Sequence, residues 1–258
     1  MQEKDNVSVR VADFSISGLL GGHFDTGKTG AMTQGFQRLK LPELPGSGSE
    51  VIREASSTRP AVWVLEQDGL RLVVKDFRPN RFLYRNVIGR FLTWREKKAY
   101  RRLRRLGGVP RLYQEVGGLA LVFEEIQGRS LENLERETRL PEEFFKKLRD
   151  LVTEVHGRGL AHCDLKRAPN VICGKDGRPY ILDWSSAISE REFRFFPMNL
   201  IYRRFILDDF NAVTKLQLGH CPEGISREEM EGYRKRSRFE KLIRAVRDKA
   251  RSLLQKIS

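Results

Sequence analysis

The chain has 258 residues, of which 40% are hydrophobic, and its 48 Lys and Arg outnumber its 34 Asp and Glu to leave a formal net charge of +14. This length and apolar content suffice to bury a substantial core and suit one two-lobed unit better than two independent large domains. No apolar run reaches transmembrane length, and the polar residues 1–6 are unlike a secretory signal. The three cysteines lack close Cys/His spacing, so neither a disulfide framework nor a zinc site is favoured.

An N-terminal extension is expected over residues 1–45, followed by a flexible Pro-Gly-Ser-Gly-Ser junction. Within the extension, residues 22–29 match the phosphate-binding pattern Gly-x4-Gly-Lys-Thr. A P-loop also needs a strong helix after the pattern, and Gly-Ala-Met-Thr-Gln-Gly is a poor helix start that Pro42 and Pro45 soon interrupt. We therefore interpret the match as a coincidence and keep a P-loop site as the alternative.

A β-hairpin is predicted next, from two apolar segments at 61–66 and 70–77 that flank an Asp-Gly turn. Lys75 stands near the end of the second, β-branched strand. A helix is predicted over 94–103, because apolar residues recur near helical spacing and a Gly-Gly pair closes the segment. These apolar residues are Leu92, Ala99 and Leu103.

A buried strand and a long helix are predicted in the middle of the chain. The strand covers residues 119–124 and runs into a short linker. The helix begins near Pro141, with acidic residues in its first turn, and ends around Gly157. Its apolar stripe has the 3.6-residue spacing of a buried helix face and consists of Phe144, Phe145, Leu148, Leu151, Val152 and Val155.

The most informative segment follows this helix. It contains His162-Cys163-Asp164-Leu165-Lys166, then Asn170, a short hairpin, and an apolar strand that ends in Asp183. A lone Asp or Asn would be read as the cap of a turn. The ordered set, however, resembles the catalytic segment of the protein-kinase-like superfamily. The resemblance implies an α+β, two-lobed protein-kinase-like fold with a compact C-lobe.

The resemblance also implies catalytic and metal-binding roles. Asp164 would orient the acceptor hydroxyl and accept its proton, and Lys166 would neutralise charge on the γ-phosphate. Asn170 and Asp183 would hold Mg²⁺. His162 is expected to be a packing and hydrogen-bonding residue rather than a base.

ATP binding would fall to residues upstream. Lys75 would contact the α- and β-phosphates, with Glu96 positioning it, and Phe123 would be the gatekeeper. The backbone of Glu124 and Ile126 would bind the adenine edge. On this basis we expect an N-lobe over residues 46–126 and a compact C-lobe over 127–258 that ends in a basic amphipathic helix.

Three departures from the kinase pattern stand out. Asn170 lies six residues after Asp164 rather than five, and Asp-Phe-Gly is replaced by Asp183-Trp184-Ser185. Without that glycine, an in/out switch of the loop is less expected. Where a glycine-rich loop should precede Lys75, residues 54–59 contain no glycine. These departures keep a catalytically silent, nucleotide-binding scaffold as one alternative.

The expectation for the phosphate acceptor depends on the length of the chain after Asp183 and on motifs that are missing there. Only about 75 residues follow Asp183, and no Ala-Pro-Glu motif appears. The chain is thus similar in character to compact bacterial kinases, namely the lipopolysaccharide kinases that act on Kdo or heptose and the RIO-type atypical protein kinases. We expect a lipopolysaccharide-core sugar as acceptor, with a protein serine or threonine as the alternative.

The positive charge favours anionic partners. In the basic segment after Arg234, apolar residues recur at helical spacing over 239–257. Such a helix either docks on the C-lobe, which we favour, or lies on an anionic membrane. We expect ATP, a sugar-lipid or protein acceptor and an anionic membrane surface as partners, without specific evidence for nucleic acid. The expected location is the cytoplasm, including the inner face of the inner membrane.

The segment 202–210 is expected in a closing helix of the C-lobe. It contains two adjacent carboxylates, Asp208 and Asp209. They either anchor the backbone of the catalytic loop or cap a helix at the surface. The sequence leaves these alternatives open.

The two candidate phosphate-binding lysines can be separated by mutation. We predict that Lys75→Met severely weakens productive use of ATP, because it removes a cation from the phosphates, whereas Lys28→Ala changes it little. Steady-state ATP turnover of both variants is the measurement. An essential Lys28 with a dispensable Lys75 would make the P-loop match the active site and overturn the fold assignment.

Overall fold

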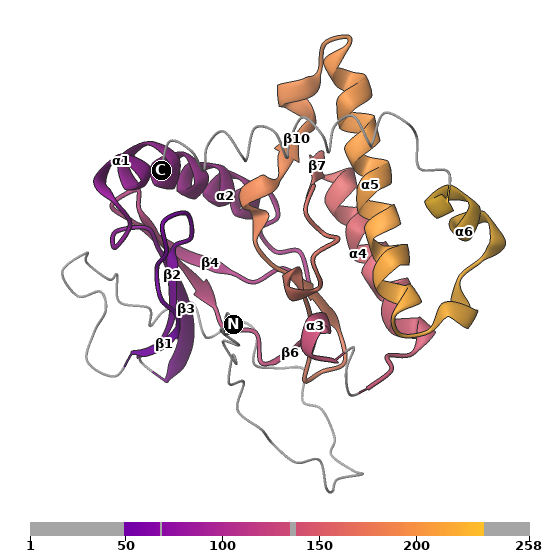
Figure 1. The fold of residues 1–258 in the computed structure, drawn as a ribbon, viewed down its shortest axis with the longest axis horizontal. Helices are drawn as coiled ribbons and strands as arrows, with labels where there is room; N and C mark the ends of the chain where they lie inside the picture. The colour runs from indigo at the N-terminus through magenta and orange to yellow at the C-terminus, as the bar shows by residue number, and fades with distance from the viewer. Residues whose placement is uncertain (1–48, 68, 135–137, 235–258) are drawn as a thin grey trace, which may run out of the picture.

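The structure is a computed structural model that describes residues 49–67, 69–134 and 138–234. The P-loop-like match and the basic run at 239–257 lie outside the described residues. The first part of the described chain forms an antiparallel sheet in the order β1-β2-β3-β5-β4 (Figure 1). Its strands are β1 (Glu50–Arg53), β2 (Ala61–Gln67), β3 (Leu70–Asp76), β4 (Leu112–Val116) and β5 (Ala120–Glu124).

The predicted hairpin forms the centre of this sheet. Lys75 of β3 lies opposite Val62 of β2 on one side and opposite Leu121 of β5 on the other. Side chains alternate along β3, so that Leu72 and Val74 are buried in the core on one face of the sheet while Lys75 projects from the other. The central strand thus places Lys75 on the face that turns toward the rest of the protein.

A continuous helical run follows β3. It consists of α1 (Phe82–Tyr84), a π-helical turn η2 (Arg85–Gly89) and α2 (Arg90–Arg102). The helix predicted over 94–103 is therefore present but begins earlier. A Cβ at Gly89 would lie 3.0 Å from the Cβ of Phe77 and 3.1 Å from its ring, so glycine lets the helical run pack closely against Phe77. The buried face of α2 includes Glu96, Ala99 and Tyr100.

The second part of the described chain is mainly helical (Figure 1). Two small antiparallel sheets, β6-β8-β9 and β7-β10, carry the loops between its helices. Helices α4 and α5 pack side by side, with α6 against α5. The bounds are β6 (Gly128–Ser130), α3 (Leu131–Leu134), α4 (Glu142–Gly157), β7 (Leu160–Ala161), η3 (Ala168–Asn170), β8 (Val171–Gly174), β9 (Pro179–Ile181), η4 (Trp184–Ser186), β10 (Ile188–Ser189), η5 (Glu190–Phe193), α5 (Met198–Leu218), η6 (Pro222–Gly224) and α6 (Arg227–Arg234).

Helix α4 confirms its prediction closely. It follows Pro141 as N-cap, and its buried residues are the predicted stripe from Phe144 to Val155. These side chains share one core with Tyr100 of α2 and with Leu121 and Phe123 of β5. The helical part and the sheet are therefore joined by apolar packing as well as by the chain.

The mixture of an antiparallel sheet with a helical second part confirms the α+β, kinase-like prediction. The division into lobes at residues 126 and 127 stays a prediction. Among the described residues, no helix has the length and apolar character needed to cross a membrane.

Two adjacent glycines after α2, Gly107 and Gly108, differ in whether the structure has room for a side chain. Gly108 has φ +81°, and a Cβ there would lie 2.6 Å from Leu151 of α4 and 2.8 Å from the Pro179 carbonyl oxygen. A Cβ at Gly107 would have nothing within 4 Å. We predict that Gly108→Ala lowers the free energy of unfolding by about 2 kcal/mol or more, whereas Gly107→Ala changes it by less than about 0.5 kcal/mol. Urea unfolding of both variants tests this, and equal midpoints would contradict it.

Candidate active site

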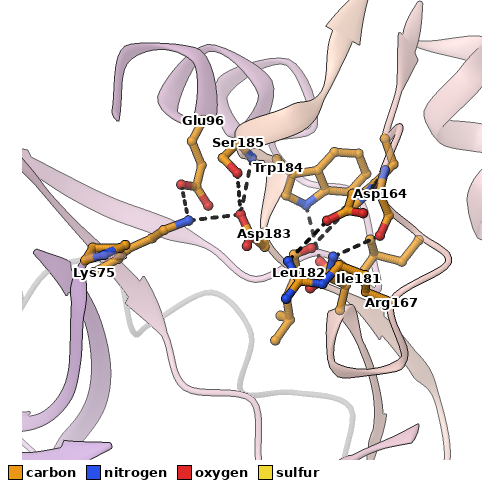
Figure 2. Close-up of polar contacts among 12 residues, drawn as sticks. Lys75, Glu96, Asp164, Arg167, Ile181, Leu182, Asp183, Trp184 and Ser185 are labelled. Atoms are coloured by element: carbon orange, nitrogen blue, oxygen red, sulfur yellow. Dashed lines mark hydrogen bonds and ion pairs between the residues drawn. The ribbon is translucent and has the colours of Figure 1, made fainter. Parts of the chain in front are cut away.

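Three charged side chains from distant parts of the chain meet at one point (Figure 2). Lys75 Nζ on β3 lies 2.7 Å from Glu96 Oε2 on α2 and 2.9 Å from Asp183 Oδ1, which follows β9. The Glu96 side chain is only 2% exposed, whereas that of Asp183 is 39% exposed. Glu96 is therefore a buried partner of the Lys75 ammonium group, while the Asp183 carboxylate is partly accessible from solvent.

The ionisation of this cluster follows from burial and charge. Burial by itself lowers the pKa of Lys75, but the attraction of Glu96 and then Asp183 outweighs it and raises that pKa above its usual value. Burial raises the pKa of Glu96 against the opposing attraction of Lys75. For Asp183, burial is outweighed by Lys75 and by the hydrogen bond from Ser185, so its pKa is lowered. Lys75 and Asp183 are therefore both charged near neutral pH.

The segment after Asp183 is held in place by its tryptophan. Trp184 is fully buried, its ring packs edge-on against His162, and its indole N–H donates to the Ile181 carbonyl at 3.3 Å. Asp183 itself has φ +58°, a conformation that Asp tolerates better than most residues. Its carboxylate accepts a 2.7 Å hydrogen bond from the Ser185 hydroxyl. Ser185 lies where kinases have glycine, and its hydroxyl thus helps to orient the Asp183 carboxylate.

The loop between β7 and β8 accommodates the extra residue before Asn170. The Arg167 N–H donates to the Asp164 carbonyl, and the Asn170 N–H donates to the Arg167 carbonyl, so two successive turns shorten the path. The Asn170 side-chain N–H then donates to the Asp164 carbonyl at 3.0 Å. Lys166, half-buried, lies in the first of these turns. Asn170 is thereby fixed to Asp164 in spite of the shifted spacing.

Asp209 of α5 anchors the other end of this loop. Its buried carboxylate accepts from the backbone N–H of His162 at 2.7 Å and of Cys163 at 3.0 Å, and it lies 3.1 Å from His156 Nε2. Of the two roles that the sequence left open for Asp209, the structure shows the anchoring one. Asp208 instead pairs with Arg204 on the same helix.

His162 has the structural role that was predicted. Its Nε2 lies 2.9 Å from the Leu182 carbonyl oxygen, and its Nδ1 accepts from the Asp164 N–H at 3.3 Å. Because a carbonyl only accepts, Nε2 donates this hydrogen bond. His162 therefore connects the loop of Asp164 to the strand that ends in Asp183.

The expected adenine-binding residues lie at the junction between β5 and β6. Glu124 ends β5, and both its backbone N–H and its carboxylate bind the backbone of Arg111. Ile126 follows in the linker and is half-buried. Because the Glu124 N–H already donates to Arg111, the backbone contact predicted between Glu124 and adenine would have to come from its carbonyl oxygen.

The loop between β1 and β2 takes the place of a glycine-rich loop. The Ser56 N–H donates to the Arg59 carbonyl at 3.0 Å, so the loop closes on itself. The side-chain amide of Asn80 donates to the carbonyls of Ser56 and Arg59, and the Tyr84 hydroxyl donates to the Thr58 carbonyl. Clamping by Asn80 and Tyr84 thus orders this loop without any glycine.

Three arginines lie near Asp183 and Asp164, and the sequence analysis did not identify them. Arg53 is desolvated, which lowers its pKa, and the positive charges of Arg59 and Arg167 lower it further while Asp183 opposes them. Arg167 Nη1 also lies 3.4 Å from Asp164 Oδ2 (Figure 2). Arg53 and Arg59 flank the β1–β2 loop, whereas Arg167 lies more than a hundred residues later, which is why sequence alone did not group the three.

The oxygen atoms at the site fit a magnesium ion. An ionised Asp183 and the Asn170 amide are the oxygen donors that Mg²⁺ prefers, and this metal usually keeps water and phosphate oxygens as its remaining ligands. In the described ranges, no group of three or more His, Cys, Asp and Glu is arranged to hold a metal by itself.

The comparisons with known proteins agree with this geometry. Residues 73–198 match the RIO domain family. The matched span begins in β3 and ends at the start of α5, so it includes Lys75, Glu96, Asp164, Asn170 and Asp183. It supports a protein-kinase-like domain of the RIO atypical type and gives no support to the lipopolysaccharide kinase family. No curated protein matches the chain.

The anchoring by Asp209 can be tested against its neighbour. We predict that Asp209→Ala lowers the free energy of unfolding by about 3 kcal/mol, because it leaves buried N–H groups of the loop without an acceptor. Asp208→Ala should cost less than about 1 kcal/mol, since its pair with Arg204 is partly exposed. Thermal unfolding of both variants is the measurement, and comparable losses would contradict the anchoring role.

Proposed function

We propose that the protein is an ATP- and Mg²⁺-dependent phosphotransferase of the RIO type that transfers the γ-phosphate to a serine or threonine hydroxyl of a protein. The observation that carries this proposal is the meeting of Lys75, Glu96 and Asp183 beside the loop of Asp164 and Asn170. The RIO domain match over the same residues supports the protein acceptor.

Nucleotide binding would rearrange the charge cluster. In the structure, Lys75 Nζ lies 2.9 Å from Asp183 Oδ1 and neutralises it directly. We propose that Lys75 moves to the α- and β-phosphates while Glu96 keeps its hold on the ammonium group. Asp183 and Asn170 would then hold Mg²⁺, which supplies charge neutralisation at the phosphates. Glu124 and Ile126 would contact the adenine edge through their backbone.

Asp164 is the proposed base. Its backbone is fixed by His162, Asn170 and Arg167, and its carboxylate is partly exposed. It would orient the acceptor hydroxyl and accept its proton as the bond to phosphorus forms. Lys166, two residues later, would balance the charge that develops on the γ-phosphate.

A lipopolysaccharide-core sugar is the second candidate acceptor. The observation in its favour is the positive charge of Arg53, Arg59 and Arg167 near Asp183 and Asp164, which suits an acceptor that bears phosphate or carboxylate groups. An acidic protein segment suits the same charge. We therefore propose that the acceptor hydroxyl has anionic neighbours, with a protein as the first choice because of the RIO match.

A silent scaffold is the weaker proposal. It rested on the shifted Asn170 and the missing glycine after Asp183. In the structure Asn170 still binds the Asp164 carbonyl, and Ser185 hydrogen-bonds Asp183. Both departures thus leave the proposed metal-binding groups close to the catalytic loop.

The acceptor can be identified with labelled ATP. The purified chain would be incubated separately with casein as an acidic protein, with histone as a basic protein, and with extracted lipopolysaccharide. We expect label in casein. Label in the lipopolysaccharide sugar alone would establish the second candidate, and label in none of them would favour the scaffold.

Asp164→Asn tests the assignment of the base. We predict a loss of transfer of about 10²–10⁴-fold with nearly unchanged ATP affinity, because the amide cannot accept the proton. Asp176→Asn, in the surface turn between β8 and β9, is the matched control and should transfer normally. Initial rates and ATP titrations provide the readout. An Asp164→Asn rate above about a tenth of wild type would rule Asp164 out as the base.

A further inference from the structure

Large apolar side chains stand exposed along one face of the run formed by α1, η2 and α2. From Leu83 onward they recur every three or four residues, as the side chains on one helix face do, and Phe82 precedes them. Their exposed fractions range from 49% to 73%. Contiguous patches of this kind mark interaction sites. We call this surface the α1–α2 face; its residues are Phe82, Leu83, Val87, Phe91 and Trp94.

A second apolar group lies next to this face. Phe195 and Phe196, just before α5, are 73% and 79% exposed. Glu192 of the preceding turn η5 binds Lys98 of α2 at 2.7 Å and Arg95 at 3.8 Å. The turn is thereby tied to α2, and Figure 1 shows both in the upper part of the molecule. The two apolar groups can therefore contact one large partner together.

Cations surround these aromatic rings. Between residues 77 and 111 the chain has twelve Lys and Arg and a single acidic residue, Glu96, which is buried against Lys75. In the described ranges, cations lie 5.2–5.6 Å from the ring centres of four aromatic residues of the two groups. These pairs are Arg85 with Phe82, Arg95 with Phe91, Lys98 with Trp94, and Arg194 with Phe195.

We propose that the α1–α2 face binds the surface of an anionic phospholipid bilayer. A helix that combines protruding Phe, Leu and Trp with Lys and Arg has the chemistry of the membrane interface, where the rings enter the headgroup region and the cations contact acidic lipids. The basic run at 239–257 is a poor cover for this face, since both are positively charged. Because Glu96 lies on the buried side of α2, the nucleotide site would remain open while the exposed side contacts lipid.

The single exposed tryptophan provides a direct probe. Trp94 is 53% exposed, whereas Trp63 and Trp184, the other two tryptophans of the chain, are 3% and 0% exposed. The full chain would be mixed with phosphatidylcholine vesicles that contain or lack phosphatidylglycerol. We expect flotation with the anionic vesicles, a blue shift of tryptophan emission, and weakening of both by salt. The Trp94→Phe variant should still float but lose the shift.

A matched pair of double variants tests the assignment to this face. Phe82→Ser/Leu83→Ser should bind anionic vesicles about tenfold or more weakly, because two inserted apolar side chains are lost. Val51→Ser/Ile52→Ser, which alters two exposed apolar residues on β1 (51% and 43% exposed), should bind as wild type. Unchanged melting temperatures would show that both variants are folded.

Three outcomes would overturn the proposal. Absence of flotation by the wild type would mean that the face serves a protein partner. If the Phe82→Ser/Leu83→Ser variant bound anionic vesicles as strongly as the wild type, the lipid would bind to another surface, such as the basic run at 239–257. Equal, salt-independent binding to neutral vesicles would contradict the role of the cations. None of these measurements uses ATP, so they fail or succeed independently of the proposed phosphotransfer.

Discussion

The buried ammonium group of Lys75 is the constraint on which the arrangement of the site depends. A charge that loses its water must be paired, or burial would neutralise it. Here the pairing comes from Glu96 on α2 and from Asp183 after β9, so one cation joins the sheet, the helix beside it and the helical second part. Any shift of α2 relative to β3 would separate a buried ion pair. The position of α2 and the geometry of the nucleotide site are therefore coupled.

The unusual residues of the site preserve this arrangement by other means. Two consecutive turns absorb the extra residue before Asn170, and the buried Trp184 fixes the segment in which kinases have Phe and Gly. Asn80 clamps a loop that contains no glycine. Each substitution replaces backbone freedom with a specific side-chain contact. A site of this kind is preorganised, and it has less capacity for switching by loop movement.

The sequence predicted the parts of the fold and the site that depend on local patterns, and it did not predict those that depend on long-range contacts. The hairpin of β2 and β3 and the apolar stripe of α4 depend on neighbours in the chain, so the sequence predicted both, and motif order predicted that Glu96 meets Lys75. The grouping of Arg53 and Arg59 with Arg167 depends on how the β1–β2 connection lies relative to the loop of Asp164. The helical spacing of Leu92, Ala99 and Leu103 indicated the covered side of α2, whereas the sequence analysis made no prediction for the exposed apolar residues of α1 and α2.

The central claim is that Asp183 and Asn170 form a working Mg²⁺–ATP site despite the altered spacing. Calorimetric titration of the full chain with ATP, in the presence of Mg²⁺ and then of EDTA, tests it most directly. We predict that Mg²⁺ tightens ATP binding by wild type and that Asp183→Asn removes this gain while leaving metal-free binding measurable. Identical affinities with and without Mg²⁺ in the wild type would contradict the account.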